Sequence, residues 1–580
     1  GGEGVFLTDA ATVTSETGAI GITGDATAGG FHAVHTGPAS MISSTGTGVL
    51  AAPLSIIGNG GSQDAVLLKG LVTAFDGSTT IRGTTALGDG IDVESGTVQA
   101  TGIGTILMSG DGTTNGVRNA ADVITNSGTL TIRSVDDDVL LEAGSTVTST
   151  SGTVTITADT TGGNSGRINM IDGSVINSGS GLVDLDADGD VLLASVITTT
   201  EVQITSVTAA ILDNDNVGVS DSLDIIAATV ALRAETGFGT DGEDLDTASD
   251  ITAGSLTLSA RTDSGDIHIV NTNTLVIGSV NGLDGVTIDD AGGVFNSAND
   301  HITLRTTGPL VVNASVANQD AGNILLNSVD SAQSNDNIEV ATGVTITATD
   351  GNGNVTLNAG DDVVLNGTAA VFAANAGTVT IVADFGSVDG RGAVRMSDGA
   401  RVVSGSGLID VDATNNVALG SLETSGDVTI DTTAGELLDG GDARVDVIAR
   451  TLTVNTAGGI GFTANSGANA AIETTVATLN AITTDGTIQV NETDGATLGS
   501  VIAGGAGDVR IVSAAGDLDV QVTMAVGNLI ALTATGGSIH DTSIGEAANI
   551  TAHEVVLRTS TGIGDASIDD SDIELDVDNF

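Results

Sequence analysis

Short runs of alternating polar and apolar residues recur along the chain. In Thr153–Thr157 the order is polar, apolar, polar, apolar, polar, which is the period of a β-strand with one buried face. Clusters of Gly, Asn, Asp and Ser, residues that favour turns, separate these runs. No stretch of ten residues combines helical apolar spacing with cap signals, so the pattern predicts an all-β protein. The same alternation recurs at Leu130–Ile132, Ile302–Leu304, Val344–Ile346, Val355–Leu357, Val379–Ile381 and Val428–Ile430.

The spacing of the runs favours one all-β architecture. Successive runs begin near positions 130, 154, 182, 202 and 223. Immunoglobulin-like sandwiches have modules of about 100 residues with a buried Trp or Tyr, propeller blades have about 40 residues, and this chain has no Trp or Tyr. The spacing therefore predicts a parallel β-helix with coils of about 20–28 residues. The general preference of parallel crossovers predicts a right-handed turn.

A long internal repeat supports a solenoid. The segment 178–196 returns at 404–422, an offset of 226 in the numbering, with eleven of nineteen positions identical. In repeat proteins each unit contacts only its neighbours, so the core grows along one axis. We expect N-terminal β-helical coils at 1–134, a first long repeat block at 135–350 and a second at 351–580, all in one continuous solenoid.

Composition is consistent with a narrow apolar core. Forty per cent of the 580 residues are apolar and only 2% are aromatic, so Val, Ile, Leu and Ala must fill the interior. Acidic, Gly-rich chains often stay disordered, but here the apolar alternation persists along the chain, which favours a folded protein. No stretch approaches the roughly eighteen uninterrupted apolar residues of a membrane-spanning helix, so we expect no membrane span.

The charge balance restricts the partners. Asp and Glu number 74 against 15 Lys and Arg, a formal net charge of −59, which argues against nucleic acid and anionic lipid as partners. Carboxylates stacked in neighbouring coils, roughly 4.8 Å apart, would repel by about 1 kcal/mol per pair in water. Salt or a divalent cation would relieve this repulsion. Because the chain has no cysteine, disulfides and thiolate metal sites are excluded.

Several strand repeats resemble those of a known group of proteins. The segments 151–159 (SGTVTITAD), 357–367 (LNAGDDVVLNG), 425–437 (SGDVTIDTTAGEL) and 452–461 (LTVNTAGGIG) are similar to repeats of giant bacterial surface proteins, the filamentous-haemagglutinin-like and related β-strand-repeat proteins. The resemblance covers most of the chain, most clearly 120–580. It implies secretion through an outer membrane, a right-handed β-helix, and a role in adhesion, matrix or surface-fibre building.

A shorter motif occurs three times and suggests that the chain is a segment of something longer. The copies begin at 230, 452 and 555, and each ends its strand in a Gly, an apolar residue and a Gly. The third copy stops where a further strand is expected, and the chain opens without a recognisable leader. Unpaired strand edges invite pairing with other strands. We therefore expect either a longer native chain or end-to-end self-association into a filament.

Candidate chemistry is sparse. Asp186, Asp188 and Asp190 alternate around Gly189, an arrangement that can gather oxygen ligands for calcium. The second repeat block has lost two of these three acids, which favours a solvated turn as the alternative. No cofactor is required by any motif, and calcium is the one candidate. Similar acidic runs occur at 136–138, 213–215 and 569–572.

The histidines give no metal constellation in the sequence. His32 and His35 lie three residues apart with no helix to align them, so a structural or surface role is expected. No nucleotide-binding loop, nucleophile elbow or zinc-protease motif occurs. Parallel β-helices that degrade polysaccharides use acids with Lys or Arg in a lateral groove, and a groove with two carboxylates and an Arg would favour that alternative.

These observations together favour a non-enzymatic role. We expect a structural protein of an extracellular filament or cell-surface fibre, assembling end to end by coil stacking and serving adhesion or matrix scaffolding. The candidate partners are other copies of the chain and cell-surface or matrix glycans. The alternatives are a calcium-dependent surface-layer or glycan-binding matrix protein and, in third place, a polysaccharide-degrading enzyme.

Overall fold

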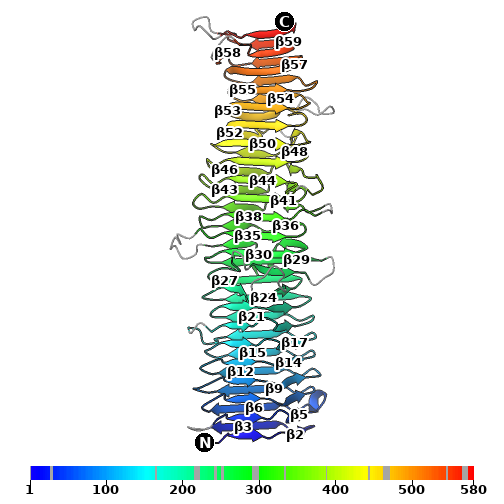
Figure 1. Ribbon diagram of the computed structural model, residues 1–580, viewed down its shortest axis with the longest axis vertical. Helices are drawn as coiled ribbons and strands as arrows, with labels where there is room; N and C mark the ends of the chain where they lie inside the picture. Colours follow the sequence, from blue (N-terminus) through cyan, green and yellow to red (C-terminus); the bar gives the residue numbers. More distant parts are fainter. Residues whose placement is uncertain are drawn as a thin grey trace. The chain divides into compact units, whose positions relative to one another are not determined.

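The computed structural model describes thirteen segments of the chain. These are residues 2–26, 31–163, 166–214, 223–240, 244–249, 254–289, 299–331, 335–386, 388–441, 444–461, 470–543, 547–564 and 572–579. The chain divides into two compact units, Gly1–Gly293 and Val294–Phe580. In both units the described residues form parallel β-strands that stack coil upon coil (Figure 1). The prediction of an all-β, parallel solenoid is therefore confirmed.

Unit 1 contains three rows of stacked strands, and each row pairs from one coil to the next. Row 1 consists of β1 (Val5–Leu7), β4 (Val34–Thr36), β7 (Val66–Leu68), β10 (Ile91–Val93), β13 (Val117–Asn119), β16 (Val139–Leu141), β19 (Ile168–Met170), β22 (Val191–Leu193) and β25 (Ile211–Asp213). Row 2 consists of β2 (Thr12–Ser15), β5 (Met41–Ser44), β8 (Leu71–Ala74), β11 (Thr97–Ala100), β14 (Asp122–Thr125), β17 (Thr146–Ser149), β20 (Val175–Asn177), β23 (Ser195–Ile197), β26 (Ile225–Ile226), β28 (Leu245–Ala248) and β30 (Ile267–Thr272).

Row 3 of unit 1 has the longer strands. It consists of β3 (Ile20–Ala26), β6 (Leu54–Gly60), β9 (Thr79–Thr84), β12 (Ile106–Asp111), β15 (Leu130–Ser134), β18 (Val154–Ala158), β21 (Val183–Ala187), β24 (Glu201–Ser206), β27 (Thr229–Ala234), β29 (Ser255–Thr262), β31 (Thr274–Ile277) and β34 (Val286–Ile288). Two kinds of described element in unit 1 stand outside these rows: a short antiparallel pair, β32 (Ser279–Val280) and β33 (Leu283–Asp284), and a one-turn 3₁₀-helix, η1 (Gly48–Leu50).

Unit 2 begins with the same arrangement. The short strands are β36 (Leu310–Val312), β39 (Ile338–Val340), β42 (Val363–Leu365), β45 (Val394–Met396), β48 (Val417–Leu419) and β51 (Leu437–Asp439). The second row is β37 (Val316–Asn318), β40 (Thr345–Ala348), β43 (Ala370–Ala373), β46 (Arg401–Ser404) and β49 (Ser421–Glu423). The third is β35 (Ile302–Thr306), β38 (Ile324–Ser328), β41 (Val355–Ala359), β44 (Val379–Ala383), β47 (Ile409–Ala413) and β50 (Asp427–Thr432).

In the last coils of unit 2 some strands lengthen because one strand pairs with strands of two rows. For example, β52 pairs with both β49 and β50. These coils consist of β52 (Val447–Thr456), β53 (Ile472–Thr483), β54 (Ile488–Glu492), β55 (Ala496–Ala503), β56 (Val509–Ser513), β57 (Leu518–Ala534), β58 (Ile539–Asp541), β59 (Ile550–Thr559) and β60 (Leu575–Asn579). None of the described segments forms an α-helix, and none contains a helix with the length and apolar character that a membrane crossing requires.

Alternation produces the core as predicted. Val154 and Ile156 of β18 are fully buried, whereas Thr155 between them is partly exposed. The same apolar side recurs in the coils above and below, since Ile156 is paired with Ile132 and with Leu185. Such a stack of apolar side chains removes apolar surface from water at every coil. This burial stabilises the fold by about 1.5–3 kcal/mol for each Val, Ile or Leu side chain.

Coil length varies more than the sequence suggests. In the shortest described coil, Ile472 is in register with Val490, 18 residues later in the chain. In the longest, the Asn59 amide group donates to Asp25, its register partner 34 residues earlier. The predicted range of coil lengths is therefore too narrow. Pairing continues across the positions at which repeat blocks were expected to meet, as Leu130 with Val154 and Leu326 with Leu357 show.

The long internal repeat is preserved in the structure. The strands β21, β22, β23, β24 and β25 correspond to β47, β48, β49, β50 and β51, and each pair of strands begins and ends at the offset that the sequence repeat has. The repeated sequence therefore encodes a repeated coil in each unit, as the segments 178–196 and 404–422 predict.

Candidate functional site

The three aspartates singled out in the sequence lie at the end of β21 and in the turn after it. Asp186 is partly buried between Thr157 and Thr205 of the neighbouring coils, and burial raises the pKa of its carboxyl. The Asp188 carboxylate accepts a hydrogen bond from the Gly163 amide (3.3 Å). The Asp190 carboxylate lies 3.2 Å from Nε of Arg167. Calcium binding by Asp186, Asp188 and Asp190 stays a prediction. Asp190 already pairs with the positively charged side chain of Arg167.

Of the other acidic runs, the one at 136–138 lies between β15 and β16. Asp136 accepts a hydrogen bond from the Thr161 hydroxyl (2.6 Å), and Asp138 accepts one from the Arg167 amide (2.7 Å). Residue 215 of the second run and residues 569–571 of the third lie outside the described residues. The turns at 136–138 therefore use their carboxylates to hold the adjacent coil.

A recurring polar contact, which we call the coil clamp, precedes each copy of the thrice-repeated motif. A buried polar residue lies six residues before the first residue of each copy and immediately precedes a strand: Asp224 precedes β26, Asp446 precedes β52 and Asn549 precedes β59. All three residues are 1% exposed. Buried polar groups are costly unless they are hydrogen-bonded, so their partners define what they do.

Each clamp residue bonds twice to an acidic residue of the next coil. Its side-chain oxygen accepts the partner's amide hydrogen: Asp224 from Asp246 (2.8 Å), Asp446 from Glu473 (2.8 Å) and Asn549 from Glu574 (2.9 Å). Its own amide donates to the carbonyl of that same partner, at 3.1, 2.8 and 2.9 Å. The clamp therefore fixes the register of one coil on the next at three corresponding positions.

The second clamp concentrates carboxylates. Ligand atoms of Asp439, Asp446 and Glu473 lie within 4.8 Å of one another. Burial, followed by the charges of Asp439 and Glu473, raises the pKa of Asp446 to about 8, against the lowering effect of its bond to the Glu473 amide. Burial also raises the pKa of Glu473. At neutral pH this group of three acids therefore holds a proton, and its oxygens are of the type that a divalent cation accepts.

The third clamp has the same geometry as the second, in which burial and the repulsion between carboxylates raise the pKa of Asp446, but without that repulsion. Here an amide, Asn549, stands where the second clamp has Asp446. The Asn549 amide group donates to the Asp541 carboxylate (2.9 Å) while its oxygen accepts from Glu574. Asp541 ends β58 as Asp439 ends β51. In the third clamp, the hydrogen bond from Asn549 to Asp541 thus takes the place of the contact between Asp446 and Asp439 in the second clamp.

In the coil after that of Glu473, Glu492 is 2% exposed and is in register with Thr474. Its carboxylate accepts hydrogen bonds from the Thr474 hydroxyl (2.5 Å) and the Thr493 amide (3.0 Å). Burial raises the pKa of Glu492 to about 7 despite these bonds. In unit 1, burial raises the pKa of Asp92 to about 7, although Arg118 lies 3.1 Å away. The strongly perturbed acids therefore lie in contacts between coils.

Cations also bridge coils. Arg118 contacts Asp92 of the preceding coil (3.1 Å) and Glu142 of the following one (3.0 Å). Arg450 contacts Asp427 at 2.7 Å. Exposed pairs of this kind contribute about 0–1 kcal/mol each. With so few cations in the chain, their placement opposite acids of neighbouring coils reduces repulsion along the stack.

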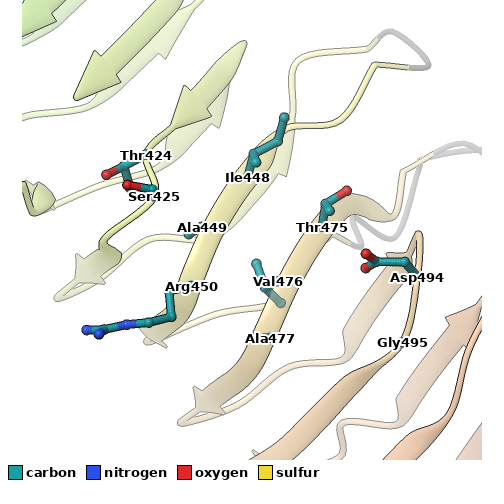
Figure 2. Close-up of a pocket in the computed structure, with 10 residues that line it drawn as sticks. All are labelled: Thr424, Ser425, Ile448, Ala449, Arg450, Thr475, Val476, Ala477, Asp494 and Gly495. Carbon is teal, nitrogen blue, oxygen red and sulfur yellow. The ribbon is translucent and has the colours of Figure 1, made fainter. Parts of the chain in front are cut away.

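Two open grooves lie on the sides of the coils. The first, of about 450 Å³, is in unit 2 and crosses four consecutive coils (Figure 2). In Figure 2, Thr424 and Ser425 lie at one side of the labelled residues and Asp494 lies at the other. It is lined by Thr424, Ser425, Ile448, Ala449, Arg450, Thr475, Val476, Ala477, Asp494 and Gly495.

The second groove, of about 310 Å³, crosses three coils of unit 1 and is lined by both carboxylates and Arg side chains, the lining expected of the polysaccharide-degrading alternative. Arg233 and Arg261 are neighbours in register on β27 and β29. Glu235 and Asp263 follow these strands and line the same groove. Sugar hydroxyls can donate to such carboxylates and accept from such guanidinium groups.

Sequence reasoning found the motif of the clamp but not the clamp itself. The Gly-apolar-Gly ends define the copies in the sequence. The clamp residue lies before each copy, and its partner lies 22, 27 and 25 residues after the clamp residue. The sequence signal for the clamp is the polar residue at the same distance before each copy, namely Asp224, Asp446 and Asn549. No family model, curated protein or solved structure matches this chain.

Proposed function

We propose that this chain is a structural protein of an extracellular filament or cell-surface fibre. In this proposal it winds as a right-handed β-helix, assembles end to end by stacking coil on coil, and serves adhesion or matrix scaffolding. The resemblance of its strand repeats to those of filamentous-haemagglutinin-like surface proteins supports an extracellular location. The high negative charge suits a surface that must stay soluble.

One observation carries the proposal: within each unit, consecutive coils pair in parallel and in register. Examples are Val5 with Val34 in the first coils of unit 1 and Ile550 with Leu575 in the last described coils of unit 2. Backbone hydrogen bonds between coils point along the stacking axis, so the same bonds that join coils inside the chain can join one chain to another.

The placement of perturbed acids supports a mechanical role. Asp446, Glu492 and Asp92, whose pKa values are raised to between about 7 and about 8, bond between coils. Perturbed groups in enzymes cluster in a cleft where substrate can reach them. In this chain the corresponding groups hold one coil on the next.

Electron microscopy of the purified full chain tests this proposal. We expect filaments of uniform width that lengthen with protein concentration and with salt, because salt screens repulsion between acidic ends. Val577→Pro in β60 removes a backbone donor on the last strand and should shorten the filaments, whereas Val577→Ala, which keeps that donor, should not. Separate particles of one length at every concentration and salt would contradict the proposal.

The mixed-charge groove has the two carboxylates and the Arg that favour a polysaccharide-degrading enzyme, and binding of a neutral glycan in it, which such an activity requires, is the second candidate function. Arg233 and Arg261 supply donors, and Glu235 and Asp263 supply acceptors, on two consecutive coils. The net charge of −59 disfavours acidic sugars. An array of neutral oligosaccharides should show binding that Arg233→Gln abolishes and Arg305→Gln, an exposed change on β35, leaves intact. Binding unaffected by Arg233→Gln would remove this candidate.

A further inference from the structure

Among the described residues, two clusters bring three potential metal-ligand atoms within 4.8 Å of one another. One is the all-carboxylate clamp of Asp439, Asp446 and Glu473. The other, in the first coils of unit 1, contains Glu3, His32 and His35. This second cluster joins two imidazoles to one carboxylate, a ligand set for transition metals rather than for calcium.

Strand stacking creates this cluster without a helix. β1 pairs with β4 so that Phe6 lies beside His35, and the amide of Gly4 donates to the carbonyl of His32 (3.0 Å). Glu3, which immediately precedes this contact, is thereby held against both histidines. The spacing of the two histidines in the sequence predicts no metal site because no helix aligns them. In the structure, a bend before β4 brings their rings to a centroid distance of 5.3 Å.

The side chains are sheltered and point toward one another. His32 is 8% exposed. Nδ1 of His35 lies 2.8 Å from Oε1 of Glu3, and the other Glu3 oxygen, Oε2, is buried without a hydrogen-bond partner. The ring of Phe6 packs against that of His35 at 4.7 Å between centroids. A buried carboxylate oxygen with no donor is costly, and a cation would relieve it.

His32 is oriented as metal-bound histidines usually are. Its Nδ1 lies 3.2 Å from the carbonyl oxygen of Asp64 in the following coil. A bond from one ring nitrogen to a carbonyl fixes the tautomer and leaves the second nitrogen as a ligand. In a tetrahedral zinc site the ligand atoms lie about 3.3 Å apart, from metal–ligand distances of about 2.0–2.1 Å. The Glu3–His35 pair would therefore widen only slightly to admit the ion.

We propose that Glu3, His32 and His35 bind a zinc-type divalent transition metal, with one coordination position left open. Glu3 belongs to the first coil, and both histidines belong to the next. The ion thus joins two coils and holds the segment before β1 in place. The acidic surface raises the local concentration of cations around the site.

Titration of metal-free full chain with zinc ions, in excess calcium and magnesium to occupy nonspecific carboxylates, tests the proposal. We expect one tight zinc equivalent. Glu3→Gln and His35→Asn should each weaken it by at least about 100-fold, since even residues that only support ligands change affinity by about 10–100-fold. His553→Asn is the control, because His553 also pairs with a carboxylate, Asp578 (3.0 Å), yet belongs to neither cluster.

Cobalt substitution provides a readout that does not depend on the variants folding. Cobalt bound to the wild-type chain should give the intense visible absorption of a four-coordinate site, and zinc should displace it. No stoichiometric zinc binding, a six-coordinate cobalt spectrum, or equal affinity in Glu3→Gln, His35→Asn and His553→Asn would overturn the proposal. Circular dichroism confirms that each variant keeps its strands.

Discussion

At the scale of single residues, the second coil clamp predicts an unusual pH dependence. The pKa of Asp446 is about 8 in the folded protein, against an ordinary value of 3.8. The folded state therefore binds more protons than the unfolded chain between these values, and the contribution of Asp446 to stability falls as pH rises through that window. The melting temperature should decline from pH 5 to pH 9.

Asp446→Asn should flatten this decline and raise the melting temperature at pH 9. The third clamp already uses an amide at this position, and the Asn549 amide donates to Asp541 as a new amide could donate to Asp439. Asp398→Asn, a change in a turn of unit 2, is the control. A melting temperature lowered by Asp446→Asn at pH 9, or an unchanged slope, would contradict this account of the clamp.

Residue-level alternation could be predicted from the sequence, because the direction of a strand side chain depends only on local period. Val154 inside and Thr155 partly exposed follow from that rule. The contacts of Glu3 with His35 and of Asp446 with Glu473 could not be predicted in the same way. They span 32 and 27 residues. Because coil length varies so widely along the chain, the local pattern leaves the partner of any one residue undefined.

A matched pair of substitutions tests the alternation directly. Leu357 of β41 is fully buried, while Thr356 beside it is partly exposed and lies between the uncharged Leu325 and Thr380. Leu357→Asp should cost at least about 3 kcal/mol, from lost burial and a buried charge, and should open this coil to limited proteolysis. Thr356→Asp should keep the resistance of the wild type. Equal cleavage of the two variants would contradict the assignment of faces.

At the scale of elements, glycine marks the turns at which neighbouring coils come closest. A Cβ on Gly128 would lie 1.9 Å from the carbonyl oxygen of Gly104, and one on Gly152 would lie 2.0 Å from that of Gly128. These glycines form a column at one corner of the stack. The abundance of glycine in the sequence predicted turns, but the column depends on how the turns superimpose.

Gly128→Ala should therefore lower the free energy of unfolding by about 1–3 kcal/mol, because the backbone of Ile103 and Gly104 in the preceding coil must shift. Gly21→Ala in β3 is the matched control, since a Cβ there has no atom within 4 Å. Chemical denaturation of both variants measures the difference. A loss no larger for Gly128→Ala than for Gly21→Ala would show that the corner is looser than the structure indicates.

At the scale of the whole molecule, the proposed filament requires that strands run across its axis and that backbone hydrogen bonds run along it. The parallel register within each unit supplies this geometry, and the acidic sides limit sideways association. The most direct test is X-ray fibre diffraction from aligned filaments of the full chain. The account predicts a strong reflection near about 4.8 Å along the filament axis. The same reflection perpendicular to the axis, or a chain that forms no filaments, would contradict it.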